Sequence, residues 1–175
     1  MDSIRYPIGR FEAVTESTPE QRHSCMERIP ELAVQLKELI GGLRAEQLHV
    51  PYRPKGWTIL QIVHHMADND MNAYIRLKRA LTEPEPAASS YREDLWAELG
   101  DYGHVPIEVS LRLMESLHIR LYVVLQHLNE RQYKRKFSTQ ALGLITVDIA
   151  VQRFVWHNSH HIAQIRSFLQ RKGWV

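Results

Sequence analysis

The chain has 175 residues, of which 44% are apolar and 24% are charged, as in an ordinary globular domain. A net charge of +2, without any run of arginine or lysine, argues against a dedicated nucleic-acid binder. Cys25 is the only cysteine, so no intrachain disulfide can form, and no stretch resembles a signal peptide or reaches the roughly 18 apolar residues of a membrane span. We expect one domain over residues 1–175, located in the cytoplasm, with neither a membrane nor a nucleic acid as its partner.

The first half of the chain predicts two long helices joined by an irregular strip. The first helix covers residues 19–40 after Thr18 as its N-cap, with a kink or a later start at Pro30. Residues 48–56 are irregular or extended, because two prolines and a glycine exclude a regular helix there. The second helix covers residues 58–81 and begins at a threonine that can cap it.

The second half predicts a short helix, two long helices and an extended strip. The short helix covers residues 92–99, and the third long helix covers residues 106–128. Residues 133–137 are expected to be extended. The fourth long helix begins near Thr146 and ends at Gly173, a residue suited to the position after a helix C-terminus. Together these elements predict an all-α fold, a four-helix bundle with a short extra helix and extended connecting strips.

A group of histidines late in the chain carries the strongest functional signal. His157 and His161 are four residues apart on the fourth helix, so they share a face with Cβ atoms roughly 5–6 Å apart. Two protein ligands rarely hold a metal well, and the adjacent His64 and His65 of the second helix are the obvious source of a third. Three protein ligands and one open position are typical of a catalytic metal site.

Helical phase separates the histidines of the fourth helix. With an advance of about 100° per residue, His161 lies about 50° and His157 about 90° from the centre of the apolar stripe. His160 lies about 150° away and is expected to face outward. Trp156 and Ile149 also point away from the stripe and are candidates for a subunit interface.

The same reasoning favours His65 over His64 on the second helix. His65 lies about 110° from the centre of the apolar stripe, and His64 lies about 150° away on the opposite flank. The flank of His65 also carries Asn69, Asn72 and Arg76. Such a polar strip on a bundle helix is expected to line a cleft.

A three-histidine site suits zinc first, with nickel, iron(II) and manganese as alternatives. Its open position can activate a water molecule or can bind and activate a thiolate. His118 on the third helix is either an acid–base group or a packed core residue, and the second reading is favoured. No aspartate or glutamate stands at an obvious position for a general base. Several polar residues within one helical turn of the histidines are candidates for orienting a ligand or a substrate: Asp68, Asn69, Asn72, Arg76, Arg153 and Gln164.

A combination of short motifs resembles the YfiT-like branch of the DinB superfamily over nearly the whole chain. The matching pieces are Arg5-Tyr6-Pro7-Ile8-Gly9, Pro51-Tyr52-Arg53, Gly56-Trp57-Thr58, Val63-His64-His65-Met66-Ala67-Asp68, Met71-Asn72, Tyr74-Ile75-Arg76, and Trp156-His157 with His160-His161-Ile162-Ala163.

The resemblance implies a four-helix bundle that binds one divalent metal, usually zinc or nickel, through three histidines. The family's ligand positions match His65, His157 and His161. It further implies a metal-dependent hydrolase and a homodimer, whereas more distant relatives transfer low-molecular-weight thiols such as bacillithiol. Ser159 stands where some relatives carry another histidine, but that position is not an implied ligand.

The sequence therefore leads to three hypotheses. The first is a cytoplasmic hydrolase that uses the three-histidine metal to activate water against a small-molecule substrate. The alternative is a thiol S-transferase that uses the same metal to activate bacillithiol or a similar thiol. The third is a protein that binds metal without turnover.

Overall fold

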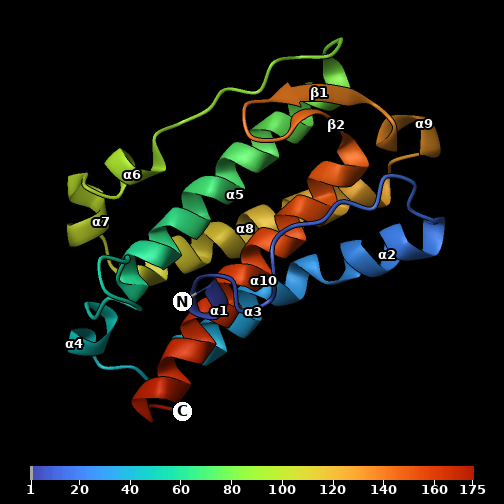
Figure 1. Ribbon diagram of the computed structural model, residues 1–175. Coiled ribbons are helices and arrows are strands. Elements are labelled where there is room, and N and C mark those ends of the chain that lie inside the picture. The colour runs from blue at the N-terminus through green and yellow to red at the C-terminus, as the bar shows by residue number, and fades with distance from the viewer. Residues whose placement is uncertain (1) are drawn as a thin grey trace.

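The computed structural model describes residues 2–175 and forms a helical bundle (Figure 1). The long helices are α5, α8 and α10, and α2 and α3 together form the fourth corner. The complete order of elements is α1 Asp2–Arg5, α2 Pro19–Glu27, α3 Ile29–Ile40, α4 Ala45–Leu48, α5 Ile59–Thr82, α6 Glu93–Trp96, α7 Gly100–His104, α8 Ile107–Gln126, α9 Glu130–Tyr133, β1 Lys136–Thr139, β2 Gly143–Thr146 and α10 Val147–Lys172. The predicted four-helix bundle is confirmed.

The packing of the long helices fixes which faces can meet. Both α5 and α3 pack against α8 and α10, so α5 and α3 stand at opposite corners of the bundle, as do α8 and α10. The contact between α5 and α10 brings the two histidine-bearing helices together. Fully buried side chains from all four corners fill the core between them: Ile29, Leu36, Ile59, Ile62, Met66, Met114, Leu125, Ile165 and Leu169.

Capping residues set the ends of the two histidine-bearing helices. The Thr58 hydroxyl accepts a hydrogen bond from the Gln61 backbone N–H at 3.1 Å, and the Gln61 side chain accepts one from the Thr58 N–H at 3.0 Å. Thr146 caps α10 through the backbone N–H of Ile149 at 3.2 Å. Gly173 ends α10 in the left-handed conformation, with φ 65°, as predicted. These ends fix where the helical phase of α5 and α10 begins.

One predicted helix is interrupted near Pro30, as the sequence indicates, and one predicted extended segment differs in the structure. The first helix is divided into α2 and α3 at Arg28, because Pro30 can occupy the first turn of a new helix but has no N–H to continue the old one. The prediction that residues 133–137 are extended is wrong at its first residue, since Tyr133 ends the short helix α9. Asn129 caps that turn by accepting from the Gln132 N–H at 3.0 Å, which competes with an extended backbone.

A small hairpin and a neighbouring segment lie across one end of α5 and α10 (Figure 1). Strands β1 and β2 are antiparallel, with the buried Phe137 opposite the buried Ile145. The segment between α5 and α6 runs beside β1, where the Ala88 N–H donates to the Ser138 carbonyl at 2.8 Å. This arrangement ties the chain that leads to α6 to the hairpin that leads to α10.

The N-terminal segment lies along α10. The Gln152 side chain accepts from the Val14 N–H at 2.9 Å and donates to the Val14 carbonyl at 3.0 Å. Nearer the C-terminus of α10, Gln164 donates to the Arg5 carbonyl at 2.7 Å. The segment therefore covers a face of α10 that the bundle itself leaves open.

A buried polar cluster joins three of the long helices. Asp70 of α5 and His118 of α8 are 0% and 1% exposed, and His118 Nε2 donates to Asp70 Oδ2 at 2.7 Å. Asn158 of α10 donates to the other oxygen of Asp70 at 2.8 Å. Complete burial raises the pKa of Asp70, while the hydrogen bonds from His118 and Asn158 oppose that rise.

Among residues 2–175, no helix is long and apolar enough to cross a membrane.

Candidate metal centre

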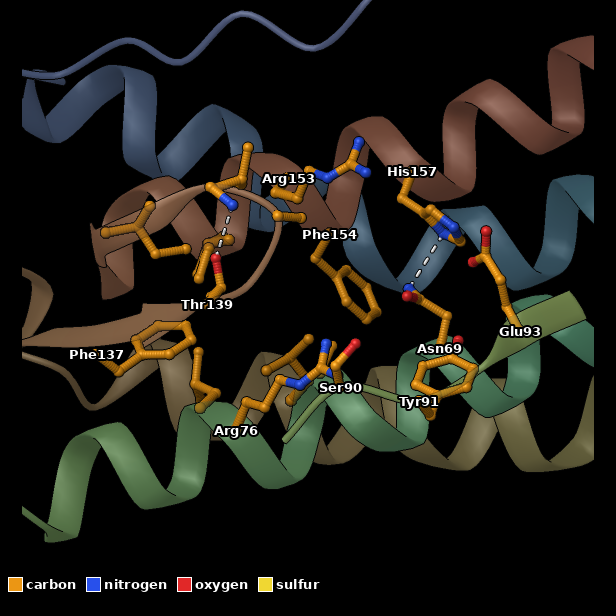
Figure 2. Close-up of a pocket in the computed structure, with 18 of the residues that line it drawn as sticks. Asn69, Arg76, Ser90, Tyr91, Glu93, Phe137, Thr139, Arg153, Phe154 and His157 are labelled. Carbon is orange, nitrogen blue, oxygen red and sulfur yellow. Dashed lines mark hydrogen bonds between the residues drawn. The ribbon is translucent and has the colours of Figure 1, made fainter. Parts of the chain in front are cut away.

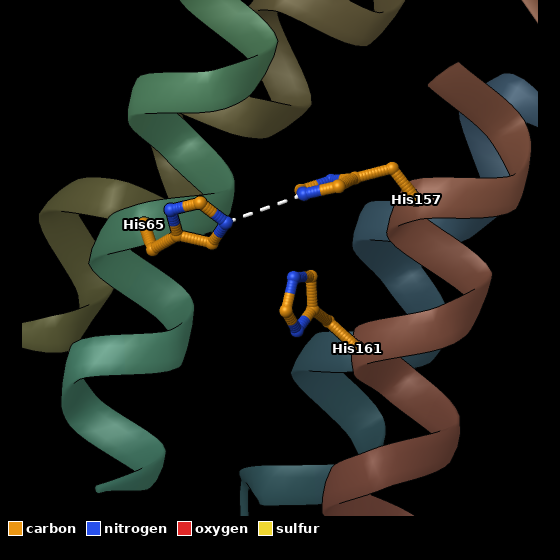
Figure 3. A group of neighbouring side chains, drawn as sticks. All are labelled: His65, His157 and His161. Carbon is orange, nitrogen blue, oxygen red and sulfur yellow. Dashed lines mark hydrogen bonds between the residues drawn. The ribbon is translucent and has the colours of Figure 1, made fainter. Parts of the chain in front are cut away.

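Three histidines converge between α5 and α10 (Figure 3). His65 comes from α5, and His157 and His161 come from successive turns of α10. Their exposed fractions are 2%, 8% and 8%. One ring nitrogen from each lies within 4.8 Å of the others, which makes them the one group of potential metal ligands of this kind among the described residues.

The spacing of the ring nitrogens fits shared coordination of one ion. His65 Nε2 and His157 Nε2 are 3.2 Å apart. Two nitrogens that bind zinc at about 2.0–2.1 Å with a tetrahedral angle would lie about 3.3–3.4 Å apart. The His65 and His157 rings therefore stand close to the separation that an ion between them requires, and His161 approaches from the next turn.

Burial keeps these imidazoles neutral. It lowers the pKa of His65 to about 4. Burial also lowers the pKa of His157 and His161 well below the usual value, with further lowering from the neighbouring histidines. Neutral rings at pH 7 have the free lone pair that a metal ligand needs.

A hydrogen-bond chain determines which nitrogen of His161 is free. The Arg5 carbonyl can only accept a hydrogen bond, so it is the Gln164 Nε2 that donates to it at 2.7 Å. The Gln164 Oε1 therefore accepts from His161 Nδ1 at 2.9 Å. With the proton on Nδ1, His161 presents the lone pair of Nε2, so a backbone carbonyl of the N-terminal segment orients this ring.

His157 has a similar partner on α5. Its Nδ1 lies 3.1 Å from the side-chain amide of Asn69. The atom that faces Nδ1 is the amide nitrogen of Asn69. A half turn of the amide exchanges its nitrogen and oxygen, and the oxygen would then accept a proton carried on Nδ1. In that arrangement the Nε2 that faces His65 would be free to bind an ion.

The prediction that His160 faces outward is wrong. His160 is 6% exposed, stacks on Trp156 with ring centroids 4.7 Å apart, and contacts Tyr6 at 5.6 Å. Phe11 packs on Trp156, with ring centroids 5.9 Å apart, and Trp156 is half-buried. Both residues do point away from the bundle core, but the N-terminal segment covers that face. His64, by contrast, turns to α8, where its Nδ1 lies 2.7 Å from the Ser110 hydroxyl.

The other predicted site residues have different surroundings. Arg153 lies beside the centre, with its guanidinium 4.5 Å from the centroid of the Trp156 ring. Asn72 donates through its amide to the Asp68 carbonyl one turn earlier in the same helix, at 2.8 Å. His118 is held in the core by Asp70, which is the packed role favoured from the sequence.

The structure adds one residue that sequence reasoning missed. Glu93, the first residue of α6, places Oε2 4.0 Å from His65 Nε2, and its side chain is 61% exposed. Partial burial and the neighbouring Asp94 raise the pKa of Glu93, while Arg153 opposes the rise. A carboxylate therefore lies beside the three histidines with access to solvent. The only hint in the sequence was the short helix predicted over 92–99, which did not indicate its position.

Comparison with known proteins agrees with this geometry. Residues 31–165 match the family described as the DinB superfamily. The chain belongs to the DinB superfamily. It is similar to the YfiT structure from Bacillus subtilis, with 38% identity, a TM-score of 0.96 and 99% coverage of both chains. YfiT is described as a probable metal-dependent hydrolase with an unusual four-helix bundle topology. The resemblance stated from the sequence is confirmed.

Relatives in other bacteria carry corresponding names. A protein of Geobacillus thermodenitrificans is 41% identical, with 99% of this chain and 98% of the relative covered. One of Oceanobacillus iheyensis is 42% identical, with 97% of this chain and 98% of the relative covered. Both are provisionally named metal-dependent hydrolases. These names and the cluster of three histidines together point to a metal in this DinB-superfamily protein.

Two cavities meet at His157. One, of about 330 Å³, opens beside His65, His157 and His161 and is bordered by Trp57 and Tyr52. The other, of about 420 Å³, extends from His157 toward the hairpin. His157, Glu93 and Arg153 line both. The candidate metal centre is thus accessible to a small molecule from two sides.

Proposed function

We propose that this protein is a hydrolase in which His65, His157 and His161 hold one divalent ion, with zinc favoured over nickel for three imidazole ligands. The observation that carries the proposal is the meeting of three buried, neutral imidazoles with a carboxylate at the junction of two cavities. When bound, such an ion polarises a substrate oxygen and lowers the pKa of water.

Glu93 is the candidate general base. From its position 4.0 Å from His65 Nε2, it can accept a proton at Oε2 from the attacking water and pass it to the leaving group. The water oxygen then forms a bond to the substrate, and the bond to the leaving alcohol or amine breaks. General-base catalysis of this kind contributes typically about 10²–10⁴-fold to a rate.

Gln164 and Asn69 have positioning roles. Each contacts the Nδ1 of one histidine and orients its ring without touching the reacting atoms, and Gln164 also fixes the tautomer of His161. Arg153 lines both cavities and lies on the same side of the centre as Glu93, where it can contact a substrate.

The thiol S-transferase hypothesis uses the same three histidines. A thiol that binds a divalent ion loses its proton without help from a neighbouring base. Glu93 therefore has a role in hydrolysis that thiol transfer does not require, which favours the hydrolase. Thermal shifts of the zinc-loaded protein with bacillithiol or glutathione test the alternative, and a large shift would support it.

The hydrolase proposal is tested with panels of chromogenic carboxylic esters, amides and phosphate esters. Turnover should depend on added zinc or nickel, and Glu93→Gln should lower kcat by at least a hundredfold while metal content stays unchanged. The matched control is Glu98→Gln, an exposed glutamate of the same region, which should retain full activity. A Glu93→Gln variant with normal kcat would refute the base assignment. Absence of metal-dependent turnover on every class would refute the hydrolase.

We also propose the homodimer that the resemblance implies. The outer face of α8 offers apolar side chains for it, among them Val109, Ile119 and Val123, which are 42–56% exposed. Light scattering coupled to size-exclusion chromatography should give a mass near twice 20.5 kDa, and a mass near 20.5 kDa would contradict it.

A further inference from the structure

The cavity that extends from His157 toward the hairpin is mostly apolar. It lies between α5 and α10, with β1 and β2 closing its far end (Figure 2). Apolar side chains from each of these four elements line it: Ala73, Leu77, Phe137, Ile145, Val151 and Phe154. The volume of about 420 Å³ falls within the range of small-molecule sites.

The cavity has a polar end and an apolar end. Figure 2 shows His157, Asn69 and Glu93 gathered at one end, Phe137 and Thr139 at the other, and Phe154 between them. A molecule held at the histidines by its reacting group would therefore extend its remaining part along apolar side chains. An ordinary packing defect does not end at a group of polar side chains, so this arrangement distinguishes the cavity from such a defect.

Small side chains create the space. Ala73 of α5 and Ala150 of α10 line the cavity, at positions where a larger apolar residue could fill it. Leu142 at the tip of the hairpin also lines it and remains 40% exposed. Leaving apolar wall in contact with water is unfavourable, so the cavity is better suited to an apolar ligand than to water.

Two unpaired donors in the wall also indicate a ligand. Arg76 Nε and Tyr91 Oη are buried, and neither has a hydrogen-bond partner among the described residues. Both residues line the cavity. Buried polar groups are nearly always paired, so these donors favour a bound molecule that offers them an acceptor atom, such as a carbonyl oxygen beside its apolar part.

From these observations, and on the basis of the proposed hydrolase function, we infer that the substrate is an ester or amide with an apolar arm. The arm, a chain or ring of medium length, lies in the cavity between α5, α10 and the hairpin. The bond that is hydrolysed lies at the three histidines beside Glu93. Specificity for the arm then resides in the wall around Ala73 and Ala150, away from the metal ligands.

Calorimetry with hydroxamates tests this inference without any need for turnover. A hydroxamate binds metal through its head group, so acetohydroxamate probes the metal centre alone and octanohydroxamate probes the centre and the cavity. Each buried methylene should tighten binding about fourfold, so octanohydroxamate should bind the zinc-loaded protein at least a hundredfold more tightly. Ala150→Phe should remove most of this gain and leave acetohydroxamate unaffected. Ala150→Ser, which keeps the space, should retain the gain, and Ala73→Phe serves if Ala150→Phe does not fold.

The outcomes separate this inference from the function on which it rests. Equal affinities for the two hydroxamates would overturn the apolar arm and leave the metal centre intact. Tighter binding of octanohydroxamate that Ala150→Phe and Ala73→Phe do not weaken would place the chain outside this cavity, which also overturns the inference. Failure of both hydroxamates to bind the zinc-loaded protein would show that the bound ion offers no open position, which would refute the proposed hydrolase and the arm with it.

Discussion

The buried pair of Asp70 and His118 leads to a quantitative prediction for stability. Asp70→Ala removes the acceptor of two hydrogen bonds, one from His118 at 2.7 Å and one from Asn158 at 2.8 Å. His118 Nε2 then remains in the core without a partner, and Asn158 Nδ2 keeps only its bond to the Phe154 carbonyl at 3.2 Å, since His118 is 1% exposed and Asn158 is 0% exposed. An orphaned buried donor costs about 1–3 kcal/mol, and breaking a buried charged pair costs about 3–5 kcal/mol.

We therefore expect Asp70→Ala to lower the free energy of unfolding by about 2–5 kcal/mol. For a chain of this size, each kcal/mol shifts Tm by about 2–4 °C, which corresponds to a fall of roughly 4–20 °C. Urea unfolding of the metal-free protein, followed by circular dichroism, measures the change. The destabilisation caused by Asp70→Ala should extend to the metal centre, since Asp70 follows Asn69 and Asn158 follows His157 in the chain.

The matched control is Asp94→Ala, which breaks an exposed ion pair with Arg92 at 2.6 Å. Such surface pairs contribute about 0–1 kcal/mol, so this variant should unfold almost as the parent does. If Asp70→Ala were no more destabilising than Asp94→Ala, the cluster would not hold α5, α8 and α10 together, and the reasoning would be refuted.

Three further predictions concern protons, ligand orientation and metal. The folded state lowers the pKa of His65 and His160 to about 4, so the unfolded chain, with values near 6.5, binds more protons between these pH values. In urea unfolding of the metal-free protein, the free energy of unfolding should be highest above about pH 6.5 and should fall by up to about 3 kcal/mol per imidazole toward pH 4. A free energy of unfolding that does not change with pH over this range would contradict the prediction. Gln164→Leu should weaken metal affinity about 10–100-fold in chelator competition, whereas the exposed Gln170→Leu should not. A free metal ion at a thousandfold excess over its Kd stabilises the folded protein by about 4 kcal/mol, so removing it with a chelator should lower Tm by roughly 8–16 °C. Identical melting curves with and without the chelator would argue against an ion that bridges α5 and α10.

Much of the fold could be predicted because its determinants are local. The capping threonines Thr18, Thr58 and Thr146, together with Gly173, mark helix ends through hydrogen bonds to residues three or four positions away. Apolar periodicity gives the long helices in the same way. Tyr133 was misplaced because a local cap at Asn129 outweighed the extended pattern that follows it.

Helical phase could indicate which histidines lie near the bundle interior, but not what covers its outer side. His65, His157 and His161 follow from spacing and phase on two helices, and the structure brings these three together. His160 was misassigned because the phase argument treats every face turned from the core as solvent-exposed. Tyr6, more than 150 positions earlier in the chain, covers that face.

Glu93 could not be found from spacing at all. It lies 28 positions after His65, beyond a loop whose course depends on its pairing with β1 at Ser138. Only the tertiary path of this loop brings the carboxylate back to α5. The apolar cavity depends on the same loop and hairpin, so its shape too was inaccessible to sequence patterns.

The most direct test of the account is the metal content of the purified protein, measured by mass spectrometry for the parent and three variants. His64 is the matched control, because it adjoins His65 in the chain but is directed to Ser110 on α8. We predict about one zinc or nickel ion per chain in the parent and in His64→Ala, and loss of the ion in His65→Ala and His161→Ala. A parent that holds no metal and takes up neither zinc nor nickel, or a His65→Ala variant that keeps its ion, would contradict the account.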